Sequence, residues 1–345
     1  MKASGYIELP AVSGIQAGRP YYCIMCPLRL VSGLFTYTDN SLPPNMREQR
    51  TLNKQRIPEM RDYVLHNRES YVFSALTASV DGDMDFVQYK NARGLGKLRI
   101  ASDARIIIND GQHRRAAIEA ALAECPELAF EDISIVIYYD LGLQRSQQMF
   151  SDLNRHAVRP TKSLDILYDN RDTFSLLIKD CIREIPLFNG SVECEKSAIS
   201  NRSAALFTLS GIYHATKILF SGHPEMSPED MRRTVIDFWS AVCDNMIIWK
   251  DAKTRSISPE TFRKEYVCAH AITLKAIGTV GKLLLSLVPD HAQWSEHLAF
   301  LREINWSKDS KELQGLVIAK GRISSSYNNQ KAFGEYLIEK SGLQK

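Results

Sequence analysis

The stretch that most constrains the fold is R-I-I-I-N-D-G-Q-H-R-R at residues 105–115. The apolar run at 105–108 predicts a buried strand, and the next three residues, Asn109-Asp110-Gly111, are typical of a tight turn. A helical pattern follows directly over residues 112–124. With further strands predicted at 20–31, 71–80 and 133–139, the first 140 residues are therefore expected to mix α and β structure.

This turn also carries the chemistry of an anion site. The first turn of a helix leaves backbone N–H groups unpaired at the positive end of its dipole, and a glycine lets a ligand approach the backbone. Basic side chains follow at once and suit phosphate oxygens. The alternative is that Asp110 only caps the helix and that the arginines form a solvated face. The candidate phosphate-, nucleotide- or DNA-binding residues of the turn are Asn109, Asp110, Gly111, Gln112, His113, Arg114 and Arg115.

A second polar run, F-S-D-L-N-R-H-A-V-R-P-T-K-S, occupies residues 150–163. Thr161 or Ser163 is expected to cap the following helix, which would place Lys162 beside a second helix start. We expect the two polar runs to form two edges of one cleft. The alternative is a solvated hinge between domains. The candidate binding residues here are Asn154, Arg159, Lys162 and Ser163.

Beyond residue 160 the sequence pattern changes to long helical segments at 162–185, 203–220, 228–250, 258–287 and 291–303. Proline and glycine separate these segments. The expected fold class is therefore α+β, with an α/β domain over 1–160 and an all-helical domain over 161–345.

Overall charge limits what the chain can bind. Among 345 residues the net charge is only +3, which excludes a histone-like polycation but permits local basic faces. One such face is predicted at 47–56, with a solvated basic surface as the alternative. A second DNA contact is predicted at 197–203, with helix capping as the alternative. The candidate contacts to the DNA backbone are Arg47, Arg50, Lys54, Arg56 and Arg202.

Seven cysteines, an odd number, favour reduced thiols and a cytoplasmic protein over a disulfide framework. The N-terminus lacks the apolar core of a signal peptide, and lysines interrupt the most apolar run, so no membrane span is expected. The Cys23-x-x-Cys26 spacing lacks a second pair of zinc ligands, so no metal site is expected. Cys26 is a redox candidate, because nearby Arg29 would lower its pKa; the alternative is a small buried residue.

Several motifs in this order resemble the DGQHR-domain family, and more narrowly the DndB regulators of the DNA phosphorothioation (Dnd) system. The resemblance covers at least the first 220 residues. Its main motifs are D-G-Q-H-R at 110–114, F-S-D-L-N at 150–154 and R-P-T-K-S at 159–163, and S-G-Y at 4–6, Q-R-T-L-N-K at 49–54 and E-K-S-A-I-S-N-R-S at 195–203 also match.

This resemblance implies a ParB/sulfiredoxin-like first domain and a DNA-binding transcriptional repressor of the sulfur-modification operon. Its implied partners are double-stranded promoter DNA and the other phosphorothioation proteins. DNA binding would need no cofactor. A two-fold DNA site would suit a homodimer, although no coiled coil specifies one.

Two other functions stay open. The first is a nucleotide-binding ATPase or DNA-nicking enzyme that uses the D-G-Q-H-R loop with ATP and Mg²⁺. Its site would combine Asp110, His113, Asp152 and Asn154 around a metal ion. The second is a scaffold for the modification proteins. Sulfiredoxins carry a catalytic cysteine in the corresponding turn, and the Gln112-His113 found here argues against that chemistry.

Overall fold

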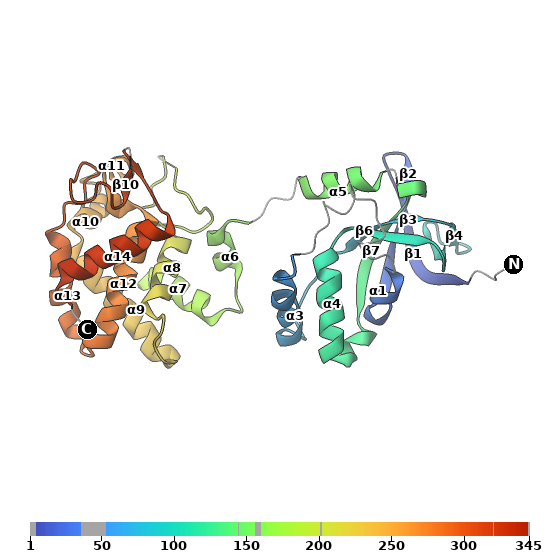
Figure 1. The fold of residues 1–345 in the computed structure, drawn as a ribbon, viewed down its shortest axis with the longest axis horizontal. Helices are drawn as coiled ribbons and strands as arrows, with labels where there is room; N and C mark the ends of the chain where they lie inside the picture. The colour runs from blue at the N-terminus through green and yellow to red at the C-terminus, as the bar shows by residue number, and fades with distance from the viewer. Residues whose placement is uncertain are drawn as a thin grey trace. The chain divides into compact units, whose positions relative to one another are not determined.

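The computed structural model describes residues 5–35, 53–143, 145–155, 160–200, 202–319 and 321–343. The chain divides into two compact units, Met1–Val158 and Arg159–Lys345 (Figure 1). Each unit is described by itself.

The first unit is built on a seven-stranded sheet with the order β4-β5-β1-β2-β7-β3-β6. Neighbouring strands are antiparallel except β3 and β7, which run parallel. The strands are β1 (Tyr6–Gln16), β2 (Arg19–Pro27), β3 (Leu76–Asp81), β4 (Met84–Gln88), β5 (Leu95–Ala101), β6 (Arg105–Asp110) and β7 (Asp132–Tyr139).

Among the described residues, three helices pack together on this sheet: α1 (Leu28–Leu34), α3 (Arg56–His66) and α4 (Gln112–Glu124). Figure 1 shows α3 and α4 side by side. Val64 of α3 and Ile118 of α4 are buried in the same apolar core as the strand residues, because both helices turn their apolar faces to the sheet. A fourth helix, α5 (Ser146–Arg155), packs against β6.

The second unit consists mainly of helices around one large aromatic core. Trp239, Trp249 and Trp294 are fully buried in it. The helices are α6 (Lys162–Tyr168), α7 (Thr173–Glu184), α8 (Leu209–Leu219), α9 (Pro228–Asn245), α10 (Ile247–Thr254), α11 (Pro259–Glu265), α12 (Ala271–Leu287), α13 (Trp294–His297) and α14 (Tyr327–Ser341).

This unit also contains two small two-stranded sheets. One pairs β8 (Val192–Glu193) with β9 (Phe207–Thr208), and the other pairs β10 (Ile318–Ala319) with β11 (Arg322–Ile323). The mixed α+β class is confirmed, but a second domain built from helices alone is not.

Two expectations about the helices have clear outcomes. The helix predicted over 112–124 is confirmed as α4 with the same bounds. The single helix predicted over 162–185 is instead α6 and α7, because Asp172 caps a new helix by accepting the backbone N–H groups of Phe174 and Ser175. In the described residues, every helix is too short or too polar to cross a membrane.

Candidate nucleic-acid interface

Gly111 forms the sharp turn between β6 and α4. Its backbone lies in the left-handed region with φ 101° and ψ 18°. A Cβ atom at this position would come closer than 3.0 Å to the buried Leu76 side chain, so both the conformation and the space require glycine. Among the described residues, no side chain caps α4. The first N–H groups of the helix therefore have no side-chain acceptor from this part of the chain.

Arg114, by contrast, is turned into the protein. Its Nη1 donates to the Ser74 and Ala75 carbonyl oxygens at 2.6 and 2.7 Å, and its Nη2 pairs with Asp110 Oδ2 at 2.6 Å. Only 14% of the side chain is exposed. These bonds tie the first turn of α4 to the segment before β3, so we assign Arg114 a structural role.

Arg115 and Asn109 also form contacts within the first unit. Arg115 pairs with Glu119 at 2.8 Å, one helical turn further on. The buried Asn109 side chain donates to Ser79 Oγ at 2.6 Å and accepts from Ser146 Oγ at 2.7 Å. Asn109 therefore links β6 to β3 and to the start of α5.

His113 joins the turn to the predicted basic segment. Its Nε2 accepts the backbone N–H of Asn53 at 3.0 Å. Burial, and then the positive charge of Arg56, lower the pKa of His113, which keeps the imidazole neutral and able to accept. Lys54 and Arg56 are exposed, and neither forms an ion pair with a carboxylate among the residues described around them. The structure thus brings this end of the 47–56 segment to the D-G-Q-H-R turn.

The residues expected to surround a metal ion are engaged locally. Asp152 accepts from Gln148 Nε2 at 2.6 Å, and Asn154 Nδ2 donates to the Phe150 carbonyl at 2.8 Å, all within α5. Asp110 pairs with Arg114. Across the described ranges there is no group of three or more His, Cys, Asp or Glu side chains that could hold a metal ion.

The second polar run divides between the two units. Asn154 lies in α5 of the first, whereas Lys162 and Ser163 begin α6 of the second. Thr161 caps α6 by accepting the Leu164 N–H at 3.2 Å, and the buried Ser163 hydroxyl bonds to Ser210 Oγ at 3.0 Å. Ser163 is therefore a packing residue.

Lys162 belongs to a basic cluster that the sequence did not reveal. With Lys217, Lys275 and His214 it lines a cavity of about 350 Å³, which we call the lysine cluster. None of the described residues that line this cavity is acidic. The pKa of His214 is lowered by burial and then by Lys275, Lys162 and Lys217, so all three charges act on the same ring.

Three different helices supply the cluster, which explains why the sequence hid it. His214 and Lys217 lie on α8, and Lys275 lies on α12. The two helices pack closely because Gly278 has no Cβ, which would otherwise overlap the Ala215 carbonyl oxygen. In the part of the chain that the structure describes, no ion pair joins the three lysines to a carboxylate.

Of the other candidates, Arg202 and Cys26 lie among the described residues. Arg202 is exposed. The expected lowering of the Cys26 pKa is wrong: the thiol is buried, and burial followed by Asp132 raises its pKa to about 11. Arg47, Arg50 and Arg159 lie outside the described residues.

The arrangement defines a protein with exposed basic groups on an α+β framework, and comparison with known proteins supplies its family. Residues 9–344 match the DndB family, which is described as DNA-sulfur modification-associated. The chain therefore belongs to the DndB family and is associated with DNA sulfur modification. Neither a curated protein nor a solved structure matches it.

Proposed function

We propose that this DndB-family chain is a cytoplasmic, DNA-binding transcriptional repressor of the sulfur-modification operon. Its first domain, 1–160, would be a ParB/sulfiredoxin-like DGQHR domain, and 161–345 a second DNA-contacting domain. Repression would follow from occupation of the promoter, which excludes the transcription machinery.

The lysine cluster is the observation that carries this proposal. Three like charges around one hollow repel each other, and an anion between them would offset that repulsion. A DNA backbone presents a continuous row of phosphates, and lysine is a strong point-charge partner for them. Because the family is associated with DNA modification, duplex DNA is the polyanion that fits best.

The first unit would add the exposed pair Lys54 and Arg56 beside the start of α4. Neutral His113 holds the backbone of this segment through Asn53, so the two cations lie next to a helix start that no described side chain caps. Arg47 and Arg50, from the same basic run of the sequence, are proposed as further contacts to the DNA backbone. Arg114 and Arg115 would support this surface rather than bind DNA, because carboxylates already neutralise them.

A gel-shift titration with the duplex upstream of the operon tests the proposal. We expect the triple variant K162A/K217A/K275A to bind more weakly at every sequence. The slope of log affinity against log salt should be smaller by about one for each phosphate that the variant no longer neutralises.

A second triple variant, K250A/K264A/K331A, is the matched control. It removes three lysines from the same unit, but each of these is paired with a carboxylate: Asp244, Glu260 and Glu335. Both triple variants lose the same net charge. Equal decreases in DNA affinity would therefore show that overall charge, and not the lysine cluster, causes the decrease. Failure of the unaltered protein to bind the duplex would refute the repressor.

The same titration with ATP and Mg²⁺ addresses the enzymatic alternative. Phosphate release or strand nicking that disappears in folded His113→Gln protein would assign catalysis to the D-G-Q-H-R turn. If the unaltered protein neither binds DNA, hydrolyses ATP nor nicks DNA, the remaining function is a scaffold for the modification proteins.

A further inference from the structure

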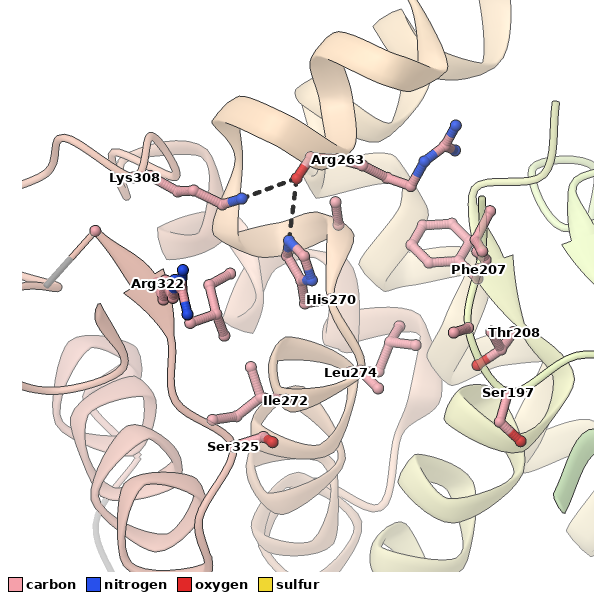
Figure 2. Close-up of a pocket in the computed structure, with 16 residues that line it drawn as sticks. Ser197, Phe207, Thr208, Arg263, His270, Ile272, Leu274, Lys308, Arg322 and Ser325 are labelled. Carbon is pink, nitrogen blue, oxygen red and sulfur yellow. Dashed lines mark hydrogen bonds between the residues drawn. The ribbon is translucent and has the colours of Figure 1, made fainter. Parts of the chain in front are cut away.

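The second unit contains a separate cavity of about 550 Å³ (Figure 2). Its walls come from the loop at 197–199, from β9, from the junction between α11 and α12, and from β11. This volume lies in the range of pockets that enclose small organic ligands.

Among the described residues that line the cavity, every ionisable one is basic: Arg263, His270, Lys308 and Arg322. These 16 described lining residues include no aspartate or glutamate. A cavity of this composition attracts an anion, and its partly buried position strengthens that attraction.

Arg263 has a structural role in the cavity wall. The Arg263 guanidinium donates to the Ser203 and Ala205 carbonyl oxygens at 2.9 and 2.8 Å and points away from Lys308 and His270 in Figure 2. Its own carbonyl oxygen accepts from Lys308 Nζ at 2.9 Å and bonds to His270 Nε2 at 3.2 Å. Arg263 therefore fixes both neighbours in position without occupying the cavity.

Lys308 and Arg322 are the two cations of the cavity that can bind an anionic ligand. The Lys308 ammonium has two donors beyond its bond to Arg263, and burial lowers its pKa. No carboxylate pairs with Lys308 or Arg322 in the ranges that the structure covers. An anion placed between them would restore the solvation that Lys308 has lost.

The rest of the cavity suits a flat organic body. Accessible apolar surface comes from half-buried Ile199 and Ile323 and exposed Ala271. The Ser197 hydroxyl is exposed on the opposite side from Arg322 in Figure 2. A ligand that satisfies both parts carries a phosphate at one end and a heterocycle at the other.

We propose that this cavity binds a nucleoside monophosphate, with the phosphate at Lys308 and Arg322 and the base against the accessible apolar part of the lining. This nucleotide site is separate from the lysine cluster, and the proposal does not depend on DNA binding there.

Calorimetric titration of the full chain with AMP, CMP and GMP tests the site, with inorganic phosphate and adenosine as half-ligands. We expect at least one nucleotide to bind more tightly than either half, and to raise the melting temperature as it saturates the protein. Arg322→Gln should weaken binding by about tenfold or more, because it removes a charged hydrogen bond. Arg302→Gln, an exposed arginine of the same unit outside the cavity, should leave affinity unchanged.

A second variant blocks the space without touching a charge. Ala198 is an exposed loop residue that lines the cavity, so Ala198→Trp should abolish nucleotide binding in a folded protein. The proposal is overturned if no nucleotide binds at millimolar concentration, if inorganic phosphate binds as tightly as the nucleotides, or if Arg322→Gln and Ala198→Trp bind normally. Duplex binding is scored separately, so either proposal can fail alone.

Discussion

Substitution of Gly111 by alanine is the sharpest test of how the fold builds the turn before α4. The residue lies at φ 101°, where a side chain is strained, and its new Cβ would overlap the Leu76 side chain. Leu76 is fully buried in the sheet core, so it has no open space into which to move.

The two effects act together. A left-handed backbone costs an alanine about 1–2 kcal/mol, and forcing an extra methyl group into a packed core costs about 1–3 kcal/mol. We therefore expect Gly111→Ala to lower the free energy of unfolding by about 2–5 kcal/mol.

The assay follows from the position of the tryptophans. All four lie between residues 239 and 306, within the second unit. In urea titrations, tryptophan fluorescence therefore follows the second unit and far-ultraviolet circular dichroism follows both. We expect Gly111→Ala to move the circular dichroism transition more than the fluorescence transition.

Gly18→Ala is the control for the backbone cost. Gly18 has φ 71°, and nothing lies within 4 Å of the Cβ position, so only the backbone cost applies. A decrease in stability in Gly111→Ala no larger than that in Gly18→Ala would refute the overlap with Leu76.

Buried polar groups and thiols give three further predictions. Asn109→Ala should lower the free energy of unfolding by about 2 kcal/mol or more, measured in urea, because two buried serine hydroxyls lose a partner. Iodoacetamide at neutral pH should label exposed Cys23 before buried Cys26 in mass spectra, and fast labelling of Cys26 would contradict its raised pKa. His270, whose pKa burial lowers to about 4, stays neutral in the folded state while the unfolded chain takes up a proton below pH 6.5. Stability should therefore fall by up to about 3 kcal/mol as the pH drops from 6.5 to 4, and His270→Asn should flatten this slope in fluorescence-monitored unfolding.

The helix α4 was predictable from local signals, whereas the break between α11 and α12 depends on a distant partner and was not. The bounds of α4 follow from a glycine before it and an alanine-rich run within it. The segment 258–287, predicted as one helix, breaks into α11 and α12 because the Val267 N–H donates to the carbonyl of Trp306 and Tyr266 bridges to Ser307. A partner so far along the chain leaves no local trace in the sequence.

The same distinction decides which charges are available for DNA. Residues 90–115 are strongly basic in sequence, but several of these cations form ion pairs with carboxylates. The pairs are Lys97 and Arg99 with Glu8, Arg105 with Asp81, Arg114 with Asp110, and Arg115 with Glu119.

One of these pairs was readable from the sequence, because Arg115 and Glu119 have the i,i+4 spacing of a helical ion pair. Asp110 ends β6, so the helical spacing rule does not apply to its pair with Arg114. The pairs to Glu8 require the β1–β5 register and were not readable. The lysine cluster is the reverse case, since its charges are dispersed in sequence and converge only when α8 and α12 pack. Basic surface is thus set by where carboxylates are missing in the fold, and for this reason we propose that DNA meets the lysine cluster rather than Arg114 and Arg115.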